Sequence, residues 1–340
     1  MIRVAVIGAG HWGPNLIRNF HNHETSEVVW IVERDEARRK SLLGRYRDAK
    51  LSSNMADALG DDSVDAVVVC TPTATHHEIA RAALLAGKHV LVEKPVTTKS
   101  SDAVELQHLA ESGGLVLMVG HVFLFNAAVR AVKQRLDTGE LGRIYYISMV
   151  RTNLGPIRAD VNAAWDLASH DISIANYWLQ AEPLSVSAMG GSWINAGVED
   201  AVFATMRYPH GVLVNLHVSW LNPLKAREIT VSGERKMLTF DDMNLQEPVR
   251  IYDKGVSTET KPQPVQDTFA SFRASLREGD ITIPRIGAGE PLKAECDHFL
   301  QCISGGQAPT SGAREGAAVV RVLEALSRSV ADHGRESRVE

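Results

Sequence analysis

Residues Val4 to Gly13 read VAVIGAGHWG, an apolar run that breaks into three glycines close to the start of the chain. The run predicts a buried strand over residues 2–7 that turns sharply into a helix. Gly8 allows the turn, Gly10 has no Cβ to keep the backbone away from a pyrophosphate, and Gly13 lets the helix pack closely on the strand. The opening of the chain therefore predicts a dinucleotide-binding site.

The residues that follow supply the context that this glycine motif requires. A helix is predicted over residues 15–22, and its N-terminus presents free N–H groups and a partial positive charge to the phosphates. A second strand, VVWIVE, ends at Glu33, twenty residues after Gly13. His11 and Trp12 lie inside the motif, so we expect them to contact the cofactor together with the glycines.

The identity of the dinucleotide depends on the end of the second strand. A carboxylate there accepts hydrogen bonds from the ribose hydroxyls of NAD and repels the 2′-phosphate of NADP, so Glu33 favours NAD. The neighbouring Arg34 keeps NADP open, because a guanidinium can pair with that phosphate. The alternative for Arg34 is a solvated surface charge beside Asp35 and Glu36.

The length and composition are those of an ordinary globular protein. A chain of 340 residues predicts two domains, and 44% hydrophobic with 23% charged residues is enough to bury a full core. The formal net charge of −5 and the pI near 6.2 give no electrostatic footprint for nucleic acid. An anionic substrate would need a local cluster of arginines and lysines.

Neither a disulfide framework nor a metal site is predicted. The three cysteines, Cys70, Cys296 and Cys302, have no CxxC spacing, and no pair of histidines has partners at metal-ligand spacing. The N-terminus has the pattern of a strand rather than of a leader peptide, and no run approaches the ~18 apolar residues of a membrane-spanning helix. We expect a cytoplasmic protein with no membrane partner.

Up to about Gly120, apolar strands alternate with helical patterns. The strands show no polar alternation, which is typical of a sheet covered on both faces by helices. Residues 1–122 are therefore predicted to form a doubly wound parallel (Rossmann) sheet of the α/β class. The predicted strands are residues 2–7, 28–32, a weak one near 50, 66–70, 89–92 and 115–119, with helices that include 75–86 and 100–112.

After a predicted helix at residues 127–136, strands follow with few helices between them. This pattern predicts an α+β domain over residues 123–340 with an open, mainly antiparallel sheet and a helix that starts near His170. We expect this domain to bind substrate and to form a homo-oligomer, dimer or tetramer, through its sheet. The predicted strands are residues 144–150, 184–189, 201–208, 212–218 and 228–231, with a hairpin turn at 208–211.

Three further segments complete this domain. Two amphipathic helices, residues 292–303 and 316–330, are expected to close the core. The polar segment 252–264 contains two prolines and is expected to form a surface loop or an interface arm.

In a doubly wound sheet the ligand lies beyond the carboxyl ends of the strands, so strand-end residues are the candidates for chemistry. Lys94 is the most specific of them, because its ammonium can donate to a substrate oxygen and stabilise a developing alkoxide. The alternative is a surface lysine paired with Glu93. The other candidates are Thr71, Pro72, Thr73, His76 and Glu93 for the cofactor, and His121 for the substrate.

Asp166 and His170 form a second constellation, at i and i+4 of a predicted helix, where both side chains project from one face. Oxidation of an alcohol requires a group that accepts the hydroxyl proton. A histidine with a pKa near ~6.5 does this at neutral pH, and a nearby carboxylate can orient it. The alternative is that Asp166 caps the helix and His170 is a satisfied interface histidine.

The segment VVVCTPTATHHEIARAALLAGKHVLVEKPVTT, followed by the Asp166 and His170 pair, resembles the Gfo/Idh/MocA oxidoreductases, the family of glucose-fructose oxidoreductase and inositol dehydrogenase. The resemblance covers nearly the whole chain. It implies that Lys94, Asp166 and His170 are catalytic, with a cis Lys94–Pro95 bond and with Glu93 and Pro95 shaping the site. It also implies that Asn126 and Arg158 lie near the substrate.

The stretches RTNLGPIRADVNAAWDLASHDISI and SWLNPLKAR resemble the branch that oxidises the 3-hydroxyl of UDP-N-acetylglucosamine or its uronic acid. The chain departs from the family pattern at Ala127 and Ser169, where prolines are usual. Both lie next to the site, so the sugar stays open. The expected function is an NAD-dependent dehydrogenase acting on a nucleotide sugar. The alternatives are a keto-sugar reductase, a cyclitol or free-sugar dehydrogenase, and a non-catalytic cofactor-bound sensor or scaffold.

Overall fold

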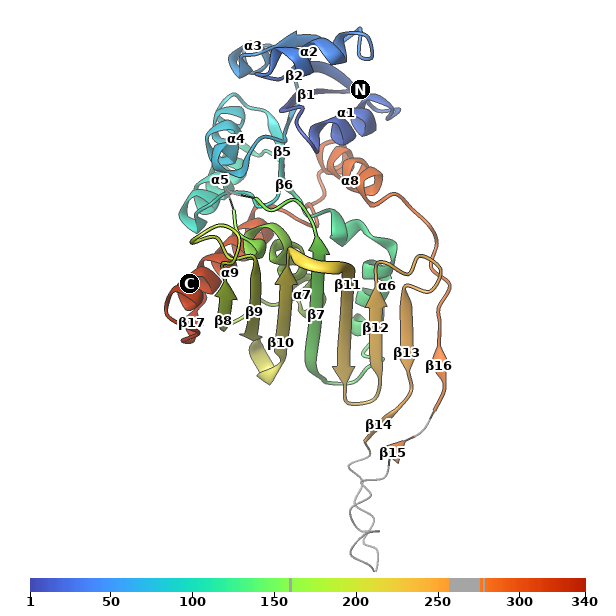
Figure 1. The fold of residues 1–340 in the computed structure, drawn as a ribbon. Coiled ribbons are helices and arrows are strands. Elements are labelled where there is room, and N and C mark those ends of the chain that lie inside the picture. The colour runs from blue at the N-terminus through green and yellow to red at the C-terminus, as the bar shows by residue number, and fades with distance from the viewer. Residues whose placement is uncertain (159–160, 257–275, 278) are drawn as a thin grey trace, which may run out of the picture. The chain divides into compact units, whose positions relative to one another are not determined.

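The computed structural model describes residues 1–158, 161–256, 276–277 and 279–340. Contacts between residues divide the chain into two compact units, which Figure 1 shows by their elements. The first unit consists of Met1–Asn126 and Gly289–Glu324, and the second of Ala127–Ala288 and Ala325–Glu340. Within the described residues, no helix combines the length and the apolar character needed to cross a bilayer.

The first unit contains a six-stranded sheet whose neighbouring strands all pair in parallel. The strand order is β3-β2-β1-β4-β5-β6, which is the order of a doubly wound dinucleotide-binding sheet. All four residues of β4 are buried, as expected for an apolar strand with helices on both faces. The predicted parallel sheet is confirmed. Its strands are β1 (Ile2–Ile7), β2 (Ser26–Val32), β3 (Lys50–Ser52), β4 (Ala66–Val69), β5 (His89–Glu93) and β6 (Leu117–Gly120).

One helix of this unit comes from far along the chain. Phe20 of α1 packs edge-to-face against Phe299 of α8, with ring centroids 6.2 Å apart. Both rings are fully buried, so α8 completes the core beside the first glycine-motif helix. The helices are α1 (Gly13–His21), α2 (Glu36–Leu43), α3 (Met55–Leu59), α4 (His76–Leu85), α5 (Ser100–Gly113) and α8 (Pro291–Gly305), with the short turns η1 (Thr73–Thr75) and η2 (Val122–Phe125) and much of α9 (Ala313–Ala331).

The second unit contains a nine-stranded sheet in the order β16-β13-β12-β11-β7-β10-β9-β8-β17. Its neighbours are antiparallel except β7 and β10, which pair in parallel, so the predicted mainly antiparallel sheet is confirmed. Its strands are β7 (Ile144–Leu154), β8 (Ser185–Gly191), β9 (Ala201–Arg207), β10 (Leu213–Ser219), β11 (Leu221–Gly233), β12 (Met237–Asp241), β13 (Val249–Tyr252), β16 (Ile281–Thr282) and β17 (Ser337–Arg338).

The hairpin predicted at residues 208–211 is confirmed. Strands β9 and β10 run antiparallel on either side of the short turn η4 (Pro209–Gly211). In β10, Val214, Leu216 and Val218 are buried while Leu213 is exposed, the alternation of a sheet with one face on the core.

The helices α6 (Ala127–Asp137) and α7 (Ser169–Leu179) lie on one face of this sheet (Figure 1). The indole of Trp178 on α7 donates to the carbonyl of Val129 on α6 at 3.0 Å. The predicted helix near His170 is therefore present. It is preceded by η3 (Ala164–Ala168), a π-helical turn in which Asp166 lies, so Asp166 and His170 do not share one continuous α-helix.

The polar segment at residues 252–264 is described only in part. Tyr252 ends β13, and a short strand β14 (Gly255–Val256) pairs antiparallel with β15 (Leu276–Arg277). Residues 257–264, where the rest of the loop or arm was expected, lie outside the described residues.

Candidate functional site

The glycine motif forms a tight turn with one open position. Gly8 has a φ of 97°, and a Cβ there would lie 2.7 Å from the carbonyl oxygen of Cys70. A Cβ on Gly13 would lie 2.2 Å from the carbonyl oxygen of Gly8, so only glycine permits this packing. At Gly10 the nearest atom to such a Cβ is Nη1 of Arg38, at 3.8 Å. The backbone at Gly10 therefore has only the far end of a long side chain as a neighbour within 4 Å, which suits the approach of a pyrophosphate.

The start of α1 is suited to an anion. Trp12 occupies the N-cap and has no side-chain oxygen to accept the first N–H groups of the helix. Those groups and the helix dipole point toward the turn. Trp12 and His11 are both exposed. Arg38, beside Gly10, adds a cation that sequence reasoning missed, because its position on the next helix gave no sign that it lies over the glycine turn.

Glu33 follows directly on β2 and is 8% exposed. Its Oε2 accepts from the backbone N–H of Ala9 at 2.8 Å, and its Oε1 accepts from that of Asp35 at 2.9 Å. The carboxylate is thus fixed against the glycine turn. Each oxygen retains an acceptor lone pair for a hydroxyl group. Arg34 is exposed.

The loops after β4 and β5 are tied together by His76. This side chain is 1% exposed, with Nδ1 at 2.9 Å from the carbonyl oxygen of Pro95 and Nε2 at 2.8 Å from that of Thr71. The Thr75 hydroxyl also donates to the Thr71 hydroxyl at 2.8 Å. The expected cis bond between Lys94 and Pro95 is confirmed. Pro72 and Thr73 are also expected at the cofactor. Pro72 is the exposed N-cap of η1, and Thr73 is buried in the first position of that turn.

Three titratable groups meet at the ends of β5 and β6. Glu93 and Lys94 are both partly exposed, and the backbone N–H of Lys94 donates to Oε2 of Glu93 at 3.3 Å. His121 is 1% exposed, and burial together with the charge of Lys94 lowers its pKa to about 3. His121 is therefore neutral at physiological pH and has no proton to give a substrate by ionisation. Asn126, also expected near the substrate, lies at the C-cap of η2.

In the second unit, the carboxylate of Asp166 is held at both oxygens. Arg158 Nη1 donates to Oδ1 at 3.3 Å, and the indole Nε1 of Trp220 donates to Oδ2 at 3.2 Å. His170 follows in the first turn of α7, where its carbonyl accepts from the Ser173 hydroxyl at 2.7 Å. The structure thus brings the side chains of Asp166 and Arg158 together. It adds Trp220, which is 1% exposed and lies in the quoted SWLNPLKAR stretch.

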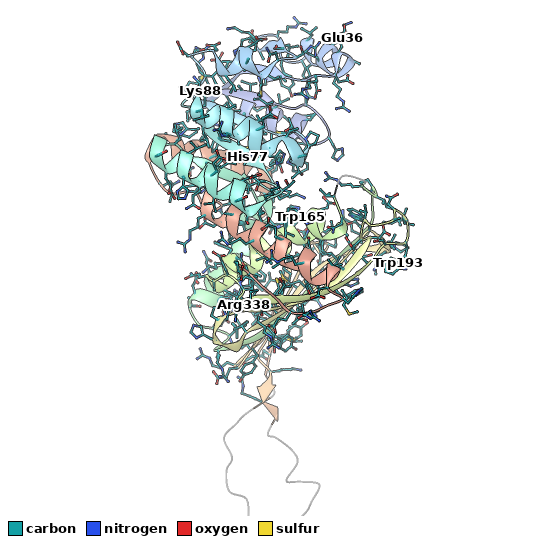
Figure 2. All side chains as sticks on the ribbon, turned by 90° about the vertical axis from the view of Figure 1, so that its left-hand side faces the viewer. Glu36, His77, Lys88, Trp165, Trp193 and Arg338 are labelled. Atoms are coloured by element: carbon teal, nitrogen blue, oxygen red, sulfur yellow. The ribbon has the colours of Figure 1, made fainter. Side chains whose placement is uncertain are left out.

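The π-helical turn that carries Asp166 is anchored on both sides. Trp165, labelled in Figure 2, donates from Nε1 to the Ser327 hydroxyl of α9 at 3.0 Å. The backbone N–H of Trp165 donates to Oδ1 of Asn162 at 3.0 Å. Just beyond His170, the buried Asp171 pairs with Arg151 of β7 at 2.7 Å. These contacts fix the backbone before and after the candidate proton acceptor.

Across the described residues, no group of three or more histidine, cysteine, aspartate or glutamate side chains has an arrangement that would hold a metal ion.

Two family models match the chain, one in each of its two parts. Residues 2–121 match the model described as "Oxidoreductase family, NAD-binding Rossmann fold", and residues 129–239 match the "GFO/IDH/MocA C-terminal domain". The two matches cover an NAD-binding sheet and the sheet domain that accompanies it. The chain is an NAD-binding oxidoreductase and belongs to the Gfo/Idh/MocA family.

Similar proteins act on different substrates. The UDP-N-acetylglucosamine 3-dehydrogenase of Acidithiobacillus ferrooxidans is 29% identical over 89% of each chain, and its structure superposes with a TM-score of 0.81 over 98% of this chain and 99% of that one. The 4-carboxy-2-hydroxymuconate-6-semialdehyde dehydrogenase of a Sphingobium species is 28% identical over 82% of this chain and 91% of that protein. GenD2, from gentamicin A biosynthesis and crystallised with NAD, is 26% identical with a TM-score of 0.82, over 100% of this chain and 96% of that one.

Proposed function

We propose that the chain is an NAD-dependent dehydrogenase that oxidises a ring hydroxyl, at C3, of a nucleotide-linked amino sugar. The observation that carries this proposal is the Asp166 carboxylate, held by Arg158 and Trp220 one turn before His170. A carboxylate in that position can orient an imidazole that accepts a proton. The similarity to a UDP-N-acetylglucosamine 3-dehydrogenase supports the choice of sugar.

The proposed mechanism gives each side chain one task. His170 accepts the proton of the substrate hydroxyl at an imidazole nitrogen, and Asp166 orients that ring. Lys94 donates a hydrogen bond to the same oxygen and stabilises the developing alkoxide. NAD, when bound, supplies the acceptor for the hydride. The proposed substrate residues are Lys94, His121, Asn126, Arg158, Asp166 and His170.

The proposed cofactor site uses the open backbone at Gly10 and the fixed carboxylate of Glu33. A Cβ at Gly10 would occupy space that the pyrophosphate needs, and Glu33 would accept from the ribose hydroxyls. This favours NAD over NADP, because the carboxylate would repel a 2′-phosphate. The proposed contacts are Gly8, Gly10, His11, Trp12, Gly13, Glu33, Arg34, Thr71, Pro72, Thr73, His76, Glu93 and Lys94.

We also propose that residues 1–122 bind the cofactor, that residues 123–340 bind the substrate, and that the chain forms a homo-oligomer through the second sheet. An exposed apolar face supports the oligomer: Phe203 of β9 is 53% exposed and stacks on His217 of β10, and Met189 of β8 is 65% exposed. Sedimentation of the purified chain tests this. A monomer at micromolar concentration would contradict it.

The substrate proposal is tested with a panel of UDP-linked amino sugars and their uronic acids, free hexoses and inositols, each assayed with NAD for NADH fluorescence. We expect turnover with a UDP-linked amino sugar or uronic acid, and loss of turnover in His170→Asn. Turnover only with inositols or free hexoses would refute the nucleotide sugar. Binding of NAD with no turnover of any compound in either direction would favour a sensor.

A further inference from the structure

Two neighbouring carboxyl groups lie in the first unit, and only one of them has a role in the proposed chemistry. Glu295 of α8 is fully buried, and neither of its carboxyl oxygens has a hydrogen-bond partner among the described residues. Glu93, at the end of β5, is close enough for its charge to act on Glu295. A buried carboxyl group without partners is costly, which points to a specific use.

The position of Glu93 is fixed by its surroundings. A Cβ on Gly120 of β6 would lie 3.2 Å from the carboxyl carbon and from both oxygens of Glu93, so the carboxyl group packs directly on the Gly120 backbone. The backbone N–H of Lys94 and the side chain of Trp12 donate hydrogen bonds to it. Glu93 therefore presents its carboxyl group at the carboxyl edge of the sheet, where the ligand of a doubly wound sheet binds.

The surrounding groups leave Glu93 as the one that exchanges a proton near neutral pH. Burial and the charge of Glu93 raise the pKa of Glu295 well above its usual range, so Glu295 stays protonated. Burial raises the pKa of Glu93 to about 7, against the lowering effects of the Lys94 charge and of the two hydrogen bonds. The thiols of Cys70 and Cys296 face the same pair, and burial first, then the acidic charges, raise their pKa values, so they stay neutral.

We propose that Glu93 links proton exchange to the charge of the bound nicotinamide, releasing a proton when oxidised NAD binds and taking one up when NADH binds. This inference rests on the proposed cofactor site. The oxidised ring is positively charged and favours the carboxylate, whereas the reduced ring is neutral and removes water from the carboxyl group, which favours its protonated form. Because Glu295 stays protonated beside Glu93, only Glu93 of this pair exchanges a proton when the cofactor binds.

The two binding reactions therefore have opposite signs. A group with a pKa near the working pH is half ionised, so at pH 7 each exchange is at most about half a proton per chain. At about pH 9 Glu93 is already ionised in the free protein, and no release on NAD binding remains.

The test is titration calorimetry of the full chain with NAD and with NADH, each in two buffers of different ionisation enthalpy, at pH 7 and about pH 9. The difference between buffers gives the number of protons exchanged. Glu93→Gln removes the exchanging carboxyl group, and we expect it to abolish both exchanges. Glu295→Gln is the matched control: it reproduces a protonated Glu295 and should leave both exchanges unchanged.

Three results would overturn the inference: equal heats in both buffers for the wild-type chain while NADH binds, exchange that persists in Glu93→Gln, or exchange that disappears in Glu295→Gln. If Glu93→Gln does not fold or bind, an infrared difference spectrum between the wild-type NAD and NADH complexes decides. A protonated carboxyl C=O band present only with NADH supports the proposal, and its absence refutes it. Binding of neither cofactor form would refute the proposed function along with the inference.

Discussion

Asp171→Asn is expected to destabilise the second unit strongly, because it removes the charge of a buried carboxylate that pairs with the guanidinium of Arg151. The Arg151 and Asp171 side chains are 4% and 2% exposed. Both Asp171 oxygens accept from Nε at 3.0 Å, and Oδ1 also accepts from Nη2 at 2.7 Å. Removing one partner of such a buried pair costs about 3–5 kcal/mol. Since Asp171 follows His170 directly, the start of α7 should loosen in this variant.

The assay is urea unfolding followed by tryptophan fluorescence. With a slope of about 2 kcal/mol per molar, the expected loss lowers the midpoint by about 1.5–2.5 M. Asp332→Asn is the matched control in the same unit, because Asp332 is 53% exposed and its partner Arg335 78% exposed. That change should cost about 0–1 kcal/mol. Similar midpoints for the two variants would refute the reasoning, whereas recovery in Arg151→Met with Asp171→Leu would support it.

Three further predictions follow from the proposed site. Calorimetry should show NAD binding at least about tenfold more tightly than NADP. Glu33→Ala should reduce this ratio of affinities. Equal affinities in the wild-type chain would show that the Glu33 carboxylate does not select the cofactor. His170→Asn should keep NAD binding, lower kcat by about 10²–10⁴-fold and remove the acid limb of the pH profile of kcat. Asp166→Asn should lower kcat by a smaller factor. An unchanged pH profile in His170→Asn would assign the proton to another group. Gly10→Ala should fold normally but bind NAD weakly. Gly13→Ala should lower thermal stability, because a Cβ at Gly13 would lie 2.2 Å from a backbone oxygen, whereas a Cβ at Gly10 meets none. Equal melting temperatures for the two variants would contradict this.

The features of the fold that the sequence predicts correctly are those that depend on residues close together in the chain. A strand such as β4, apolar at every position, has few alternatives to the middle of a covered parallel sheet, and the glycine motif fixes where the cofactor edge begins. Strand β11 shows the limit. The sequence predicts it at residues 228–231, but it extends over Leu221–Gly233, because its first half has no buried residue and carries a register shift, so no apolar alternation reveals it.

The parts of the site that were missed depend on contacts between distant segments. Trp220 donates to Asp166 across 54 positions, and Trp165 of the π-helical turn donates to Ser327 of α9. Spacing alone cannot distinguish this turn from an α-helix. One local signal did exist for Glu295: it lies between Leu292 and Phe299 on the apolar stripe of α8, where an acidic residue is unexpected.

The packing of α8 on α1 determines when the core of the first unit can form during synthesis of the chain. The first of the two segments of the first unit ends at Asn126, but the core of the unit lacks Phe299 until Pro291–Gly305 has left the ribosome. At a synthesis rate of about 5–20 residues per second, this interval is on the order of 10–40 s. Throughout that time the nascent cofactor unit exposes Phe20, while all the strands of the second sheet except β17 emerge behind it. We therefore expect a fragment that stops at residue 126 to expose the Phe20 side chain and to aggregate instead of binding its cofactor.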